Sequence, residues 1–157
     1  MIQRPQTVLL GLVALFMLAS LFLPNWEKTS KDGKSFARQN SLELSFHLGD
    51  NKADKKNRVH LTLLMGLVAG LSSYSISRYK NRLLQMKLGF AITLGIAATL
   101  IFLMLGSREG EALFDPDAKG RYLSGFYLLF LALFSNIASN RLIRRDENLV
   151  RSMDRIR

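Results

Sequence analysis

The chain has 157 residues, with 22 basic and 12 acidic side chains and a formal net charge of +10 at pH 7. These totals fit a basic soluble domain, but the charges are segregated. Four windows, 8–24, 61–77, 88–106 and 122–139, contain no Asp, Glu, Lys, Arg or His. A helix of a water-soluble fold keeps a polar stripe toward solvent, so the four windows exclude an ordinary soluble protein.

Each window has the length of a membrane span. At about 1.5 Å of rise per residue, the windows give roughly 26 to 29 Å of helix, close to the hydrocarbon thickness of a bilayer. We therefore predict an all-α membrane protein, a bundle of four transmembrane helices that forms one domain over residues 1–157. Residues 25–60 are its long first outer loop, too short for a second domain of usual size.

The first window has a second interpretation. Arg4 before an apolar run that ends in Ala19-Ser20 is also typical of a secretory signal peptide. The apolar run is long for such a signal, so we expect an uncleaved span. Pro24 and Trp26 then mark the boundary, because proline cannot continue a helix and indole prefers the headgroup level.

The outer loop contains one alternating stretch. In residues 42–48, the apolar residues Leu42, Leu44, Phe46 and Leu48 fall on one side of a strand. Residues 36–38 are expected to pair with this strand after a turn at Asp32-Gly33. The sequence thus predicts a small β-sheet on the outer helix ends, with a disordered polar loop as the alternative.

Small and polar residues mark candidate helix contacts. Gly66 and Gly70 have the small-xxx-small spacing that lets two helix backbones approach closely, and Gly95 has similar neighbours in the third span. Asn136 in the fourth span is expected to hydrogen-bond across an interface. We therefore predict helix packing at Gly66, Gly70, Gly95 and Asn136.

Serines cluster at the end of the second span, at Ser72, Ser73 and Ser75. Their hydroxyls can bond to carbonyls one turn earlier, which makes them tolerable without a function. A polar transport path that also uses Asn136 is the alternative. It is less favoured, because four spans must oligomerise to enclose a path and the windows offer no charge for ion coupling.

Orientation follows from the basic residues. An even number of spans places both termini on one side, and 11 basic residues lie on each side. On the terminal side they are concentrated in residues 78–87 and in the tail. Because Lys and Arg in short segments favour the cytoplasm, we expect both termini to be cytoplasmic.

The tail, residues 140–157, contains no Pro or Gly and is predicted to continue the fourth helix. One interpretation is a helix end that lies on anionic lipid. The other is a docking helix for a protein partner. In both cases the expected contact residues are Arg144, Arg145, Leu149, Arg151, Met153 and Arg155.

Residues typical of catalytic and metal sites are sparse. The chain has no cysteine, and His47 and His60 lie outside the windows, so we expect no cofactor and no metal. Two carboxylate pairs, Glu109 with Glu111 and Asp115 with Asp117, offer oxygens for a divalent cation, but solvated loop charges are the simpler explanation.

Intramembrane catalysis usually needs ionisable residues in the spans, so we expect no enzyme. We expect no nucleic-acid partner either, since basic residues commonly flank spans.

A family resemblance rests on three segments: the opening residues 1–7, the exit Leu23-Pro-Asn-Trp26 and above all residues 140–157. With these, the chain resembles the domain-of-unknown-function family 4293 of Bacteroidetes inner-membrane proteins. The resemblance covers nearly the whole chain. It implies four spans in the bacterial inner membrane, cytoplasmic termini and no assigned activity. The layout also looks like the claudin-type four-helix plan, which is an analogy of fold alone.

The sequence therefore favours a non-enzymatic scaffold or accessory subunit that binds other proteins through its tail helix and outer loop. Expected partners are membrane lipid, a protein in the membrane or cytoplasm, and a second copy of the chain. A small oligomeric transporter or channel is the alternative. A membrane-embedded enzyme acting on lipid is the least favoured class.

Overall fold

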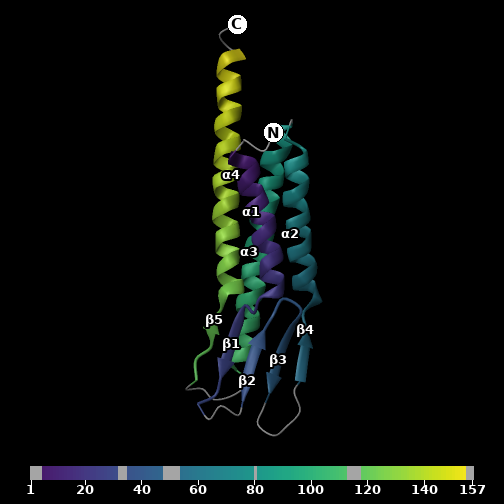
Figure 1. The fold of residues 1–157 in the computed structure, drawn as a ribbon, viewed down its shortest axis with the longest axis vertical. Coiled ribbons are helices and arrows are strands. Elements are labelled where there is room, and N and C mark those ends of the chain that lie inside the picture. Colours follow the sequence, from purple (N-terminus) through teal and green to yellow (C-terminus); the bar gives the residue numbers. More distant parts are fainter. Residues whose placement is uncertain (1–4, 32–34, 48–53, 80, 113–117, 155–157) are drawn as a thin grey trace.

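The computed structural model describes residues 5–31, 35–47, 54–79, 81–112 and 118–154. Four helices and five strands follow one another in these ranges (Figure 1): α1 (Pro5–Phe22), β1 (Trp26–Thr29), β2 (Phe36–Gln39), β3 (Glu43–His47), β4 (Asp54–Asn57), α2 (Val59–Ser77), α3 (Arg82–Glu111), β5 (Arg121–Tyr122) and α4 (Ser124–Asp154). All four helices are long and apolar enough to cross a membrane.

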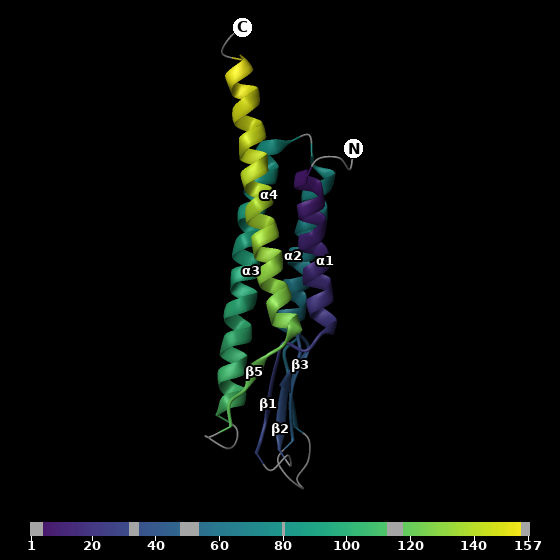
Figure 2. The same ribbon diagram turned by 60° about the vertical axis from the view of Figure 1, so that its left-hand side comes forward.

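The helices form a four-sided bundle. α1 packs against α2 and α4, and α3 packs against the same two helices. Both chain ends lie at one end of the bundle and the strands lie at the other (Figures 1 and 2). We call these the terminal end and the sheet end.

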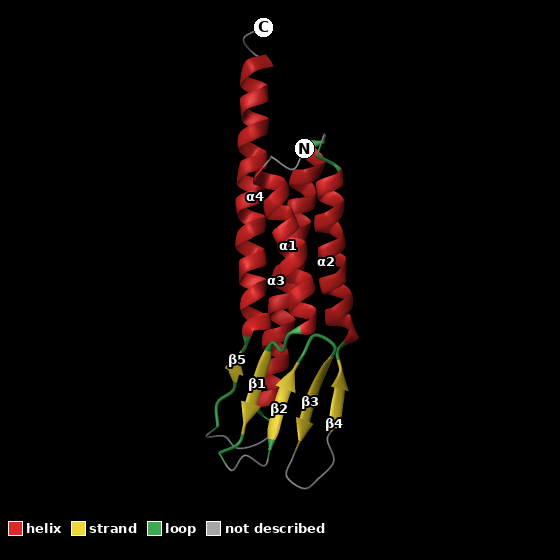
Figure 3. Cartoon of the chain, viewed as in Figure 1, coloured by secondary structure: helices red, strands yellow, loops and turns green. Residues whose placement is uncertain are grey.

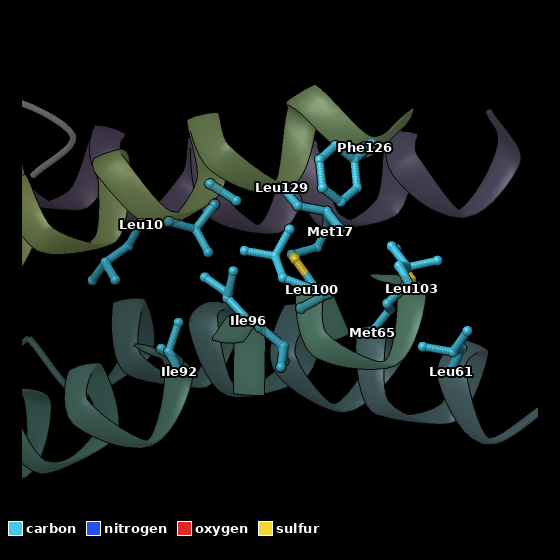
Figure 4. Packing of buried hydrophobic residues seen from close by; sticks show 14 residues of the cluster. Leu10, Met17, Leu61, Met65, Ile92, Ile96, Leu100, Leu103, Phe126 and Leu129 are labelled. Atoms are coloured by element: carbon cyan, nitrogen blue, oxygen red, sulfur yellow. The ribbon is translucent and has the colours of Figure 1, made fainter. Parts of the chain in front are cut away.

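Apolar side chains from the helices pack together in the bundle interior (Figure 4). Its centre is a buried cluster to which every helix contributes, including Leu10, Met17, Leu61, Met65, Ile92, Ile96 and Leu129. Large apolar side chains also cover the outside, and Phe22 is 86% exposed. Lipid tails are as apolar as leucine, so close packing and interhelical hydrogen bonds must hold such helices together.

The strands form one antiparallel sheet in the order β4-β3-β2-β1-β5 (Figure 3). The predicted small sheet is therefore confirmed, and it has more strands than the alternating stretch indicated. Leu44 is buried, whereas Leu42 precedes the strand and is exposed, so its predicted place on the buried side is wrong. Leu48 and the predicted turn at Asp32-Gly33 lie outside the described residues.

Two helices run past the predicted spans. α3 continues beyond Gly106 to Glu111 and lies against β1, β2 and β3, as Figure 2 shows. α4 continues without interruption into the tail, as predicted, and its described part ends at Asp154. The first extension backs the sheet, and the second projects from the terminal end (Figure 1).

Candidate functional site

Trp26 fixes the sheet to the bundle. Its indole is 2% exposed and packs with Ala37 and Leu44. It also fills the space in which a Cβ of Gly110 or Gly120 would lie. Both positions need glycine because any side chain there would collide with the ring. Trp26 is therefore a structural anchor between α3, the sheet and the segment before β5.

Two buried basic side chains, Lys28 in β1 and Arg58 just before α2, bind glutamates near the end of α3. Lys28 Nζ, on a side chain that is 1% exposed, donates to the Glu111 carbonyl at 2.7 Å and lies 3.3 Å from its carboxylate. The Arg58 guanidinium lies 2.8 Å from Glu109, which also binds Lys56 at 2.8 Å. These contacts compensate the cost of burying charge. Glu109 and Glu111 thus hold cationic side chains of the chain itself, while Asp115 and Asp117 lie outside the described residues.

The opposite face of the sheet is partly exposed and carries both basic and acidic side chains. Strand register places Arg121, Glu27, Arg38, Ser45 and Lys55 in one row across all five strands. Arg121 Nε donates to Glu27 at 2.9 Å and Arg38 donates at 3.2 Å, and the hydrogen bond from Arg121 is the main cause that lowers the pKa of Glu27. We call this row the sheet face.

An aromatic pair and an ion pair extend the sheet face. Phe36 and His47 stack with their ring centroids 5.3 Å apart. Lys55 donates to Glu43 at 3.0 Å, and this hydrogen bond is the main cause that lowers the pKa of Glu43. The face thus offers an exposed ring stack beside several cations.

Near the terminal end, side chains bridge all four helix contacts by donating to backbone carbonyls. Ser72 donates to Leu10 O at 2.9 Å and Gln85 to Ser75 O at 2.9 Å. Asn136 donates to Gly89 O at 2.9 Å, and Ser139 donates to Gln6 O at 3.2 Å. Each donor is buried, so the bonds form without competition from solvent.

The predicted packing residues divide into two groups. Gly95 lies against Val68, which occupies the place of a Cβ, and Asn136 joins α4 to α3. Among the described residues, no atom lies within 4 Å of a Cβ built on Gly66 or Gly70, and both are exposed on α2. The expected close packing of Gly66 and Gly70 is therefore not a contact within the bundle. Their spacing marks a face that points outward.

The tail leaves the bundle at the start of α3. Arg82 donates to Asp146 O at 3.0 Å and lies 4.0 Å from the Glu147 carboxylate. Arg144, Arg145 and Leu149 are exposed, Leu149 to 55%. The Glu147 carboxylate thus turns toward α3, while Arg144 and Arg145 are exposed. Arg151 and Met153 lie in α4, and Arg155 lies beyond the described residues.

The sequence did not reveal two polar residues that the structure places inside the bundle, Gln6 and Gln85. Gln6 and Gln85 stand just before apolar windows, where they read as flanking residues. Helical spacing could have predicted their burial, because each lies on the same helix face as a buried apolar residue. Gln6 lies one helical turn from Leu10, and Gln85 lies two turns from Ile92. Within the described ranges, no group of three or more His, Asp or Glu side chains could hold a metal ion.

These features define a class: a four-helix protein with the lengths and apolarity of a multi-pass membrane protein, capped at one end by an antiparallel sheet. The chain belongs to the domain-of-unknown-function family DUF4293, which matches residues 2–156. No curated protein matches it.

Proposed function

We propose that the protein is a non-enzymatic scaffold or accessory subunit of the bacterial inner membrane, with both termini in the cytoplasm. In this proposal the tail binds a cytoplasmic partner and the sheet face binds a partner on the outer side. The observation that carries it is the continuation of α4 beyond every other helix of the bundle (Figure 1).

The tail has the features of a contact surface. It contacts the start of α3 through Arg82, which meets Asp146 and Glu147. Beyond Glu147 the helix continues for about 10 Å at 1.5 Å per residue. An isolated helix of this size is marginal in water, but continuity with α4 removes the cost of nucleation. The exposed Leu149 gives the projecting part an apolar contact point.

The sheet face supports the outer half of the proposal. Trp26, Lys28 and Arg58 anchor the sheet from behind, so its exposed face is presented on a rigid support. The Phe36–His47 stack and the neighbouring arginines combine an aromatic anchor with charge, a composition typical of protein interfaces.

A small oligomeric transporter or channel is the alternative function. Its polar path would use Ser72, Ser75 and Asn136, which all point into the bundle near the terminal end. From Val13 to Met17 and across to Leu129 the interior is apolar apart from Thr99, whose hydroxyl donates to Gly95 O within its own helix. The polar residues of the terminal end therefore form no continuous row toward the sheet end. We therefore rank the scaffold above the transporter.

The test compares the full chain with three variants: deletion of residues 141–157, Leu149→Asp and Asn148→Asp. The last is the matched control, since it adds the same charge at an exposed neighbour. We expect the deletion and Leu149→Asp to lose the same co-purifying protein from mild detergent while Asn148→Asp retains it. An unchanged set of proteins after the deletion would remove the scaffold's main contact surface and favour the transporter.

Lipid attachment of the tail is separable by salt. If the tail only lies on anionic headgroups, its protection from protease should fade at high ionic strength. The two substituted chains, Leu149→Asp and Asn148→Asp, should then behave alike, because each adds the same charge.

Orientation is tested with single cysteines, which the chain otherwise lacks. Ser35→Cys should react with a membrane-impermeant thiol reagent in intact spheroplasts, and Ser152→Cys should react only after lysis. The reverse pattern would invert the proposed topology.

A further inference from the structure

The terminal end of the bundle contains five buried side-chain oxygens that have no hydrogen-bond partner among the described residues: Gln6 Oε1, Ser75 Oγ, Gln85 Oε1, Asn136 Oδ1 and Asn140 Oδ1. We call these five residues the polar layer. All four helices contribute to it, and Gln6, Ser75, Gln85 and Asn136 are at least 98% buried.

Hydrogen bonds fix the members of the polar layer at nearly one depth. Ser139, beside Asn140, donates to Gln6 O, which aligns α4 with α1. Gln85 donates to Ser75 O, which aligns α3 with α2. Ser72 donates to Leu10 O, so one turn further on Ser75 stands opposite Gln6 in these antiparallel helices. Side chains from facing helices at one level of a four-helix bundle can form a site in its core, and the Asn140 amide lies against Gly89 of α3 at this level.

The chemistry of the layer restricts what it binds. All five unpartnered atoms are oxygens, and the amide nitrogens of Gln85 and Asn136 already donate to carbonyls. The layer therefore presents mainly acceptors, with the Ser75 hydroxyl also able to donate, and does not suit an anion. It contains no carboxylate, and Arg78, Arg82 and Arg141 lie at the same end of the bundle. Two helix N-termini, of α1 and α3, and one C-terminus, of α2, lie at this end, so the helix dipoles add to these positive charges and disfavour a cation. A neutral hydrogen-bond donor remains.

We propose that the polar layer is a hydrated binding site inside the bundle, which takes small neutral hydrogen-bond donors, with water as the resident ligand. Water bonded to several otherwise unpartnered groups is a regular component of protein interiors. The site ends at the apolar cluster around Val13 and Ile96, so it is closed toward the sheet end.

Cysteine reactivity tests hydration directly, because the chain has no cysteine of its own. Ser75→Cys places a thiol in the polar layer, and Ala132→Cys places one in the apolar cluster; both positions have 0% exposure. The reacting species is the thiolate, whose formation needs a polar environment, and one pKa unit changes its fraction tenfold. With the small neutral reagent methyl methanethiosulfonate in mild detergent, we expect Ser75→Cys to react at least about tenfold faster.

Equal rates at the two sites would overturn the proposal, provided that both variants keep the melting temperature of the parent.

A second measurement covers the case in which a cysteine variant does not fold. Gln6→Met, Ser75→Ala and Asn140→Leu each remove an unpartnered oxygen without removing a hydrogen bond that its side chain makes within the described residues. A hydrated layer loses water bridges, so each variant should melt at a lower temperature. A dry layer loses only unpaired acceptors, and higher melting temperatures would overturn the proposal.

Salt identity tests the charge of the ligand. Melting of the parent chain is compared in sodium, potassium, ammonium and choline chloride at equal concentration. We expect no difference among the four. Stabilisation by one of the small cations that disappears in Asn140→Leu would show that the site holds a cation, which contradicts a neutral ligand.

Discussion

The two ends of the bundle are held together by different chemistry. At the sheet end, buried charges are paired: Lys28 binds Glu111 and Arg58 binds Glu109, around the large anchor Trp26. At the terminal end the buried bridges are uncharged, and several oxygens there have no partner among the described residues. The two ends thus differ in the charge of their buried bridges. Buried polar atoms without a partner among the described residues occur at both ends, on Gln39 and Arg58 at the sheet end and on five side chains at the terminal end.

The difference also concerns backbone contact. Near the sheet end, Gly106, Gly110 and Gly120 each lie so close to another side chain that a Cβ would collide with it. On α2, Gly66 and Gly70 have open space around them. Glycine therefore allows tight packing at these positions, as Gly89 does against Asn140 near the terminal end, and leaves helix surface uncovered at Gly66 and Gly70.

Trp26→Ala should give the largest loss of stability. It removes a nearly fully buried indole between α3 and the sheet, and truncating a buried Trp costs about 3 to 5 kcal/mol. Phe22→Ala is the control, since Phe22 is large, apolar and exposed near the same end. Thermal unfolding in detergent should separate the two variants clearly. Similar melting temperatures would mean that the sheet is not anchored by this ring.

Gly95→Leu and Gly70→Leu should behave differently although both change glycine to leucine within a span. At Gly95 the new side chain collides with Val68, and overpacking costs about 1 to 3 kcal/mol. At Gly70 it enters open space and should be tolerated. The check is again thermal unfolding. An equal loss at Gly70 would show that the outward face of α2 packs against a second chain in detergent.

Asn136→Leu should have an intermediate effect on the terminal end. It removes bonds to Gly89 O and Thr93 Oγ1, at 2.9 and 2.8 Å. Interhelical hydrogen bonds in membrane proteins are worth about 0.6 kcal/mol on average and up to about 1.7 kcal/mol. Ser73→Ala is the control, because Ser73 bonds only to Ala69 O within its own helix. A loss no larger than that of Ser73→Ala would contradict a bridging role.

The sequence predicted the elements whose signal is local. The uncharged windows located all four helices, and the alternation around Leu44 located the central part of the sheet. β4 was missed because its residues Asp54, Lys55, Lys56 and Asn57 are all exposed and show no alternation. β5 has two residues, too few for any period.

Contacts between distant segments had no signal in one sequence. Whether a glycine pair faces a helix or the lipid depends on the rotation of α2 about its axis, which packing of Leu61, Met65 and Val68 decides. Likewise Glu109 and Glu111 read as solvated loop charges, because their partners Arg58 and Lys28 lie more than fifty residues away. The tail was predictable because a helix without Pro or Gly continues past the membrane.

The smallest expected effect is a pH dependence at the sheet face. Arg121 and Arg38 hold the pKa of Glu27 below its ordinary value of 4.5, so the native state favours the ionised carboxylate. The resulting stabilisation is complete well above pH 4.5 and is lost as the pH falls through the lowered pKa of the folded protein. Because Arg121 and Arg38 are largely exposed, this stabilisation should have the size of a surface ion pair, roughly 0 to 1 kcal/mol.

Glu27→Gln should therefore melt slightly below the parent at pH 7, and the difference in melting temperature should shrink as the pH is lowered below 4.5. A difference that stays constant or grows toward acid would mean that the carboxylate does not stabilise the sheet face through its charge. In that case the strand pairing alone would hold the sheet face in place.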